Sequence, residues 1–185
     1  MQHALVRRAQ SGDREAFGII VREAIARLYA SARLILRDPD RAQDAVQEAL
    51  IDAWRDLPGL RDPDRLEAWL HRLLVRSCYR LAKSDRRRRI IEIPLAFDHD
   101  RSTLDGLEGI GLRDELDRAL ARLSPDQRTI LVLTYYADLS LADVSAALAI
   151  PIGTAKSRLH RAANALRAAL AADQRAVALM TGRII

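Results

Sequence analysis

The chain has 185 residues, a net charge of +5 and a single cysteine, Cys78. One cysteine excludes an intrachain disulfide and a cysteine-based metal site, and the four scattered histidines show no metal-ligand spacing. Hydrophobic residues make up 49% of the chain but aromatic residues only 4%, which favours helical packing. No apolar run approaches the roughly 18 residues that cross a bilayer, and the first residues are too polar for a secretory signal. We therefore expect an all-α cytoplasmic protein without metal or cofactor and without insertion into a membrane.

Charge divides the chain into three parts. The net charge is +6 for residues 1–89, −4 for residues 90–110 and +3 for residues 111–185. The acidic middle part has one proline, two glycines and no sustained period, which is typical of a linker. These patterns predict two small helical domains, 1–89 and 111–172, joined by a flexible acidic linker at 90–110. The tail at 173–185 is weakly patterned and receives no role.

In the N-terminal part, helices are expected at residues 13–36 and at about 40–56, with Pro39 suited to a first helical position. The second helix has an apolar side made of Val46, Ala49, Leu50, Ala53, Trp54 and Leu57. Its other side carries Asp44, Gln47, Glu48, Ile51, Asp52 and Arg55. An isoleucine among carboxylates favours a protein partner with basic side chains, although a single surface isoleucine needs no explanation. The residues leave these two interpretations even.

A basic helix is expected from residue 66 to at least residue 86, after a loop at 58–65. Its apolar side carries Leu66, Trp69, Leu70, Leu73, Leu74, Ser77 and Leu81. Its other side carries His71, Arg72, Arg76, Tyr79 and Lys83, with Arg80 at the edge. Arginines at a helix C-terminus complement the helix dipole, but that accounts for only two of the seven cations between residues 72 and 88. Basic side chains interleaved with an aromatic ring favour a nucleic-acid surface. Trp54 and Trp69 are predicted to be core residues.

The C-terminal part begins with an expected helix at 112–123. Ser124, Pro125 and Gln127 then form a capping-box pattern before a second, buried helix at 128–136. Ser140, with Asp143 three residues later, predicts the start of a short third helix.

A tight turn and a basic helix follow. Residues 151–172 hold four basic side chains and no acidic one. At about 100° per residue, one side of this helix is apolar: Ile152, Ala155, Leu159, Ala162, Ala163, Leu166 and Leu170. The opposite side is polar and cationic at its N-terminal end, where a recognition helix meets DNA. The pattern predicts a helix-turn-helix, although such patterns are degenerate and an ordinary helical hairpin with a solvated basic face is the alternative.

Four segments carry a family resemblance, in this order: residues 44–54 (DAVQEALIDAW), 69–73 (WLHRL) with the Arg-rich end of its helix, 123–128 (LSPDQR) and 151–161 (PIGTAKSRLHR). Together they resemble the extracytoplasmic-function (ECF) group of bacterial sigma-70 family RNA polymerase sigma factors. The resemblance covers about residues 5–170. It implies an all-α chain in which 1–89 is sigma region 2 and 111–172 is the helix-turn-helix region 4. It also implies a transcription initiation factor rather than an enzyme.

The resemblance implies roles for three sets of residues. The −10 promoter element would be bound and melted by Arg76, Tyr79, Arg80 and Lys83. The −35 element would be read by Thr154, Lys156, Ser157, Arg158, His160 and Arg161. The β′ clamp helices of RNA polymerase would contact Asp44, Gln47, Glu48, Ile51 and Asp52, while region 4 touches the β flap. Such proteins are often held inactive by an anti-sigma partner. Arg76 and Arg80 stand where the family often has Asn and Asp, so the −10 preference should differ from the family average.

Three rival functions are weighed against this interpretation. An autonomous helix-turn-helix regulator usually dimerises on a palindrome, but no heptad-like dimer helix is visible. An enzyme would need a nucleophile–base pair, a metal cluster or a phosphate-binding glycine loop, and the sequence shows none of them. The third alternative is a pure interaction adaptor, which an Arg161→Ala variant with full promoter activity would favour.

Overall fold

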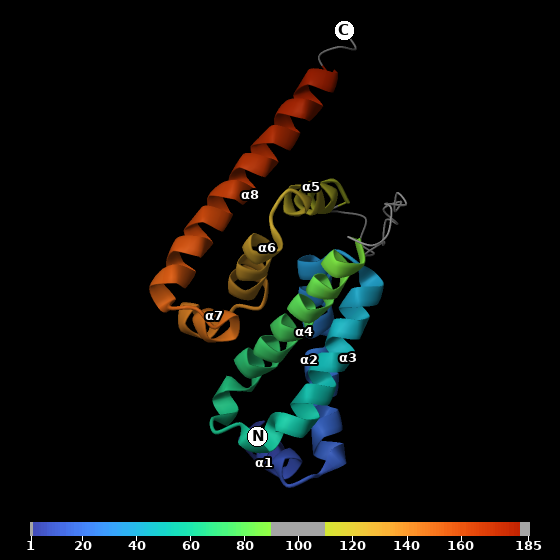
Figure 1. Ribbon diagram of the computed structural model, residues 1–185, viewed down its shortest axis with the longest axis vertical. Helices are drawn as coiled ribbons and strands as arrows, with labels where there is room; N and C mark the ends of the chain where they lie inside the picture. The colour runs from blue at the N-terminus through green and yellow to red at the C-terminus, as the bar shows by residue number, and fades with distance from the viewer. Residues whose placement is uncertain (1, 90–109, 182–185) are drawn as a thin grey trace.

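The computed structural model describes the backbone of residues 2–89 and 110–181, and the side chains of residues 3–83 and 114–173. Within these ranges the chain is helical and forms two groups of helices that pack against each other (Figure 1). The predicted linker at 90–110 lies outside the described residues except for residue 110, which begins the next helix. No helix in the described part of the chain is long and apolar enough to cross a membrane.

The N-terminal group contains α1 (Gln2–Gln10), α2 (Arg14–Leu36), α3 (Pro39–Asp56) and α4 (Leu66–Arg89). Asp13 caps α2 by accepting hydrogen bonds from the backbone amides of Glu15 and Ala16, both at 3.0 Å. Asp38 caps α3 through the amide of Arg41 at 3.0 Å. Pro39 thus occupies the predicted first helical position, and α3 begins one residue earlier than expected because Asp38 is the cap. Two short 3₁₀ turns, Leu57–Gly59 and Pro63–Arg65, form the loop before α4.

The core of this group lies between the four helices. Val6, Leu28, Leu57 and Leu74 are essentially fully buried in it, and Trp69 is also a core residue, as predicted. The prediction was wrong for Trp54, which is 38% exposed. Its ring lies at the edge of α3 against Phe17, with the two ring centroids 4.9 Å apart in an edge-to-face arrangement. The α2 helix covers only one side of the indole, which leaves the other side in solvent.

His71 was also placed on the wrong side of its helix by the sequence pattern. Its side chain is 1% exposed, because α2 crosses the face of α4 on which it lies. One ring nitrogen lies 3.0 Å from the Glu67 carbonyl oxygen and the other 3.3 Å from the Ser31 hydroxyl. Burial lowers the pKa of His71 below its ordinary value, so the ring is neutral at pH 7 and serves the packing of α2 on α4.

The C-terminal group begins with α5 (Ile110–Ala121) and α6 (Pro125–Leu131). Ser124 and Gln127 form the predicted capping box: the Ser124 hydroxyl accepts from the Gln127 amide at 3.3 Å, and the Ser124 amide donates to the Gln127 side chain at 2.9 Å. After α6 the chain passes into a π-helical turn, Val132–Tyr136. The predicted buried helix at 128–136 is therefore only partly buried. The wider turn rotates its end outward, and Tyr135 is 68% exposed.

The last two helices are α7 (Leu141–Leu148) and α8 (Ile152–Thr181). Ser140 caps α7 as predicted, accepting from the Asp143 amide at 3.2 Å, and Ala149 ends it in the left-handed conformation with φ of 53°. Ile152 was expected on the apolar side of α8 but is 55% exposed, because α7 ends before it can cover the first turn.

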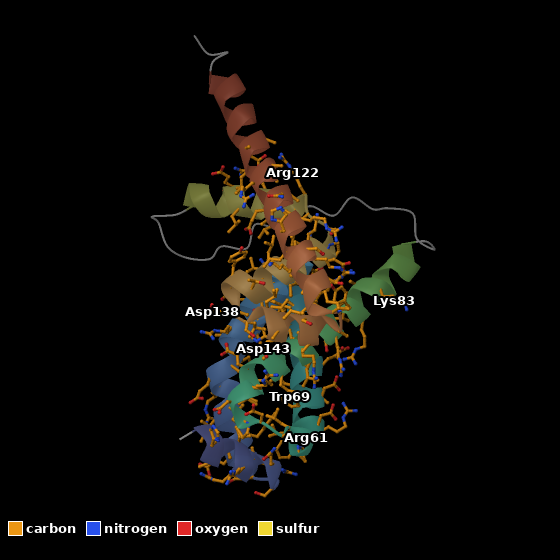
Figure 2. The ribbon with its side chains drawn as sticks, turned by 90° about the vertical axis from the view of Figure 1, so that its left-hand side faces the viewer. Arg61, Trp69, Lys83, Arg122, Asp138 and Asp143 are labelled. Carbon is orange, nitrogen blue, oxygen red and sulfur yellow. The ribbon has the colours of Figure 1, made fainter. Side chains whose placement is uncertain are left out.

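Helix α8 continues well past the predicted domain end, through backbone that includes part of the tail (Figure 1). Asp173 anchors this extension: its side chain is 6% exposed and forms ion pairs with Arg122 and, at 3.9 Å, with Arg118 of α5. Figure 2 shows Arg122 beside α8, where its guanidinium also donates to the Ala169 carbonyl at 3.1 Å. The first tail residue therefore joins α8 to α5.

The two groups of helices meet along α4. Val75 of α4 is 2% exposed and belongs to the C-terminal core, whereas Val132 of the C-terminal group belongs to the N-terminal core. The Arg128 guanidinium donates to the Ile35 carbonyl at the end of α2, at 3.1 Å, and also to the Leu123 carbonyl, at 2.9 Å. The contact between the groups is thus apolar at its centre and hydrogen-bonded at its edge.

Leu74 and Leu116 offer a matched test of the N-terminal core. Leu74 is fully buried, whereas Leu116 on α5 is 41% exposed. We expect Leu74→Ala to lower the free energy of unfolding by about 2–5 kcal/mol, because it leaves a cavity, and Leu116→Ala by less than about 0.5 kcal/mol. Urea denaturation followed by circular dichroism measures both values. Equal losses in the two variants would contradict the position of Leu74.

Candidate nucleic-acid interface

In the N-terminal half of α8, four of the predicted −35 residues share one side (Thr154, Ser157, His160 and Arg161), and Lys156 and Arg158 lie at its two edges. Lys156, Ser157, His160 and Arg161 are exposed, and Thr154 and Arg158 are half-buried. The Arg161 guanidinium lies 3.4 Å from the Ser157 carbonyl, so it rests along the helix rather than in a salt bridge. These side chains lie near the helix N-terminus, where free amides and the dipole favour phosphate. The structure therefore brings this predicted set together on one cationic surface.

The opposite side of α8 explains how this surface is held outward. Ala155 and Ala162 are fully buried in the C-terminal core, next to Val144 of α7. Alanines at these positions let α8 approach α6 and α7 closely. Because the small residues are fixed inside, the longer polar side chains of α8 must face solvent.

The predicted −10 residues are divided by the structure. Arg76, Arg80 and Lys83 are exposed at i, i+4 and i+7 of α4 and form a cationic stripe. Figure 2 shows Lys83 toward the end of α4 that extends past the other helices. Tyr79 is half-buried instead, and its hydroxyl donates to the Asp126 carboxylate at 2.9 Å. Burial, together with this carboxylate, raises the pKa of Tyr79 to about 12. In this arrangement Tyr79 faces the C-terminal helices rather than solvent.

Arg80 differs from its two neighbours because it is engaged with α3. Its Nη2 atom lies 3.0 Å from Glu48 Oε2, 3.2 Å from Asp52 Oδ2 and 2.9 Å from the Ser77 hydroxyl. Burial lowers the pKa of Arg80, but the bonds to Asp52 and Glu48 outweigh it and the pKa is raised. A residue predicted for DNA therefore contacts two residues predicted for polymerase.

The predicted polymerase residues form one surface of α3. Asp44, Gln47 and Ile51 are exposed, with Ile51 at 57%, while Glu48 and Asp52 are partly covered on the side facing α4. Asp52 also pairs with Arg55 one turn along α3. The surface thus offers an apolar side chain bordered by acceptors, which suits a partner with basic groups.

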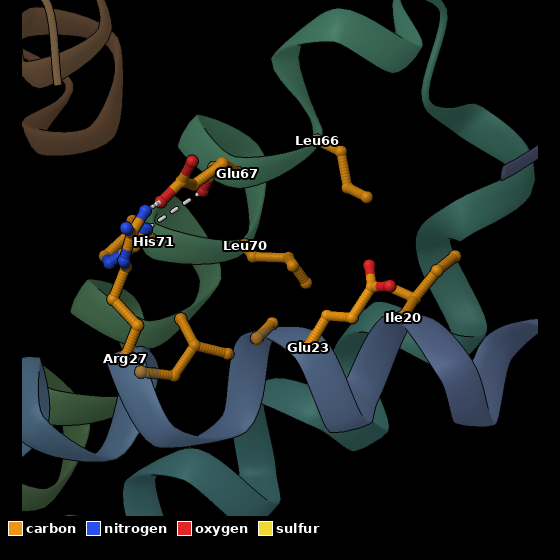
Figure 3. A pocket seen from close by; sticks show the side chains of 9 residues that line it. Ile20, Glu23, Arg27, Leu66, Glu67, Leu70 and His71 are labelled. Carbon is orange, nitrogen blue, oxygen red and sulfur yellow. Dashed lines mark hydrogen bonds and ion pairs between the residues drawn. The ribbon is translucent and has the colours of Figure 1, made fainter. Parts of the chain in front are cut away.

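A pocket of about 290 Å³ lies between α2 and α4 (Figure 3), and none of its lining residues belongs to either cationic surface. Arg27 forms an ion pair with Glu67 there, and the neutral His71 ring is bonded to the Glu67 backbone. These polar groups satisfy one another across the junction of the two helices. We therefore interpret the pocket as a packing feature rather than as a reaction site.

The described part of the chain shows neither a metal-binding cluster nor a reactive thiol. No group of three or more His, Cys, Asp or Glu side chains is arranged there to hold a metal ion. Cys78 is 2% exposed, and burial raises its pKa to about 12. A buried thiol with so little thiolate is a poor nucleophile at neutral pH.

The residues that join the two helical groups were missed by the sequence analysis. Val75 lies at the apolar centre of this contact, and the exposed Asp126 lies at its edge, where it is bonded to Tyr79. A signal was present: Val75 is an apolar residue on the side of α4 that otherwise carries Arg72 and Tyr79. An apolar residue among polar ones predicts contact with another element, but it does not identify which one.

Comparison with known proteins gives matches over both helical groups. Residues 20–88 match the family model "Sigma-70 region 2", and residues 113–166 match "Sigma-70, region 4". The RNA polymerase sigma-H factor of Pseudomonas aeruginosa is 30% identical over 177 residues, which cover 90% of this chain and 92% of that protein. The ECF RNA polymerase sigma factor SigM of Mycobacterium tuberculosis is 35% identical over 153 residues, covering 82% of this chain and 76% of SigM.

Two solved structures have the same fold. CnrH, in complex with the cytosolic domain of CnrY, superposes with a TM-score of 0.67 at 26% identity, covering 93% of this chain and 98% of CnrH. The sigma factor RpoE, in complex with the anti-sigma factor NepR from Bartonella quintana, superposes with a TM-score of 0.70 at 27% identity. That superposition covers 85% of this chain and 98% of RpoE.

Proposed function

Because the chain belongs to the extracytoplasmic-function group of the sigma-70 family, and is therefore an RNA polymerase sigma factor, we propose that α4 and α8 divide the recognition of its promoters. Helix α4 binds the −10 element through Arg76, Arg80, Lys83 and, once uncovered, Tyr79. Helix α8 reads the −35 element through the six side chains named above. The observation that carries this proposal is the presence of two separate cationic helix surfaces, one on each helical group.

Strand opening in this proposal is driven by binding rather than by catalysis. Extruding a base from the stack costs a few kcal/mol, and a cationic groove with an aromatic side chain offsets that cost through phosphate contacts and stacking. The stripe on α4 supplies the cations, and Tyr79 supplies the ring. The protein therefore acts in the cytoplasm as an initiation factor without chemistry of its own.

The α3 surface is the proposed contact with the β′ clamp helices of the polymerase. Ile51 forms the apolar centre, and Asp44, Gln47, Glu48 and Asp52 surround it with acceptors. We also propose that an anti-sigma partner controls this chain, because the similar RpoE structure was solved with such a partner. A partner of that kind would compete for the surfaces of α3 and α4.

The function is tested by run-off transcription with core RNA polymerase on a library of genomic promoter fragments. Specific transcripts that appear only when this protein is added support the proposal. Footprints from the protein alone on palindromic sites, with no transcripts, would instead support an autonomous helix-turn-helix regulator.

Two variants test the surfaces separately in that assay. Ile51→Glu places a charge at the apolar centre of the α3 surface and should lower core affinity at least tenfold without affecting folding, because Ile51 is 57% exposed. Arg161→Ala should reduce promoter affinity about fivefold to a hundredfold, because it removes an arginine that contacts a base. Its affinity for core polymerase should not change.

Matched controls accompany both variants. Ile25→Glu alters another exposed isoleucine of the same helical group, and Arg22→Ala removes an exposed arginine of α2. Neither lies on a proposed surface, so neither should change transcription by more than about twofold. Controls that fail as badly as the test variants would refute the assignment of these surfaces.

The two recognition helices are too close together in this arrangement to contact both elements. The −10 and −35 promoter elements are named for positions about 25 base pairs apart, which corresponds to roughly 85 Å of DNA at about 3.4 Å per base pair. In the structure, Tyr79 of α4 and Leu159 of α8 pack against the same apolar cluster. The contact through Val75 and Asp126 must therefore open when a promoter is bound.

Energy transfer between dyes measures this opening. Dyes are placed on Arg61→Cys, just before α4, and Ala142→Cys in α7, which are exposed positions near the 3.8 Å ion pair of Arg65 and Asp143 between the two groups; Cys78 is buried and escapes labelling. We expect high transfer in the isolated chain and a clear fall with core polymerase and promoter together. Transfer that stays unchanged in a transcribing complex would rule out this opening.

A further inference from the structure

The cationic stripe of α4 and the acceptor surface of α3 meet at one side chain, Arg80. Arg76 and Lys83 lie one turn before and one turn after it, and both are exposed. Arg80 reaches across to the neighbouring helix, where Glu48 and Asp52 lie 3.0 and 3.2 Å from its Nη2 atom. The middle cation of the proposed DNA surface is thus held by the proposed polymerase surface.

This arrangement makes the centre of the stripe unfavourable for DNA. Glu48 and Asp52 compensate the charge of Arg80, and Asp52 also pairs with Arg55, so the cluster of these four side chains is neutral. The two N–H groups of Nη2 are shared among three acceptors, because the buried Ser77 hydroxyl also lies within 2.9 Å. A phosphate at this position would meet carboxylates that repel it, together with a cation whose charge is already compensated.

We propose that Arg80 couples polymerase binding to DNA binding: Glu48 and Asp52 hold its guanidinium in the isolated chain and release it to a DNA phosphate when basic side chains of the polymerase bind these carboxylates. The inference rests on the function proposed above. It adds that Arg80 is a positioning residue for α3 in one state and a phosphate ligand in the other. Arg76 and Lys83 need no such release.

The exposure of the cluster makes this transfer feasible. The side chains of Arg80 and Glu48 are 56% and 43% exposed, and an ion pair so open to water is weak. Asp52 is 20% exposed, but its carboxylate is shared between Arg80 and Arg55. A competing cation can therefore displace the guanidinium without a large penalty. Because binding linkage is reciprocal, DNA that takes Arg80 must also favour the polymerase at Glu48 and Asp52 to the same degree.

A double-mutant cycle on the isolated full-length chain tests the first half of the proposal. The probe is a short fluorescent single-stranded oligonucleotide of mixed sequence, which the chain binds mainly through phosphate contacts, and anisotropy gives its affinity. Glu48→Gln with Asp52→Asn should tighten binding severalfold, because Arg80 is freed. Adding Arg80→Gln should remove most of that gain, whereas Arg80→Gln alone should cost little.

Asp56→Asn is the matched control, because it removes one carboxylate from the end of α3, where Asp56 is exposed and none of the described contacts joins it to Arg80. It reports the general effect of removing negative charge, which should be small. The salt dependence of binding gives a second readout. The freed Arg80 should steepen the slope of log affinity against log salt concentration by about one phosphate contact, and the control should leave that slope unchanged. Unfolding midpoints confirm that all variants are folded.

The second half is tested in holoenzyme, at core concentrations that saturate binding. Arg80→Gln should weaken promoter binding there by about fivefold or more, although it cost little in the isolated chain. Equal losses in both settings, or additive effects in the cycle, would overturn the coupling. Transcription with the wild-type chain distinguishes failure of the coupling from failure of the proposed function. If specific transcripts form while the effects in the cycle are additive, only the coupling is wrong. If no transcripts form, the proposed function itself is wrong.

Discussion

The burial of helix α4 on two sides is the constraint on which the rest of the structure depends. One side places Leu74 in the N-terminal core, and another places Val75, the next residue, in the C-terminal core. Only the strip of α4 that lies outside both cores can carry charged side chains, and Arg76, Arg80 and Lys83 lie on that strip. Helix α4 therefore joins the two groups of helices while they are in contact. Its cationic side chains can bind a partner only on the strip that neither core covers.

Charge arrangement on the surface follows from how α3 and α4 pack. The two helices are neighbours along the N-terminal core, so the acidic edge of α3 lies beside the basic strip of α4. Attraction between the acidic edge of α3 and the basic strip of α4 stabilises the isolated chain modestly. The same carboxylates reduce the positive electrostatic potential that DNA would meet at α4. Among the described residues, no ion pair joins the basic side chains in the N-terminal half of α8 to an acidic helix, and the described bond of Arg161 stays within its own helix. The two proposed DNA-binding surfaces therefore differ in their electrostatic environment before a partner binds.

Local chemistry allowed much of the fold to be predicted from the sequence. The Ser124 and Ser140 caps and the alanines of α8 are where hydrogen bonding and helical period require them. The predictions that went wrong involve contacts between helices distant in sequence. His71 is buried because α2 crosses it, Trp54 is exposed because α2 covers only one of its sides, and Tyr79 is bonded to Asp126, 47 residues away. A periodic pattern identifies the sides of a helix, but it cannot show which helix covers them or how completely.

The most direct test of the account is to map where α4 and α8 lie on one promoter. A DNA-cleaving reagent is attached to Ala82→Cys in α4 or to Asn164→Cys in α8, next to the proposed contacts, while buried Cys78 stays unmodified. In complexes with core polymerase, the account predicts cleavage around the −10 element from the first position and around the −35 element from the second. Cleavage of one and the same stretch of DNA from both positions would contradict it.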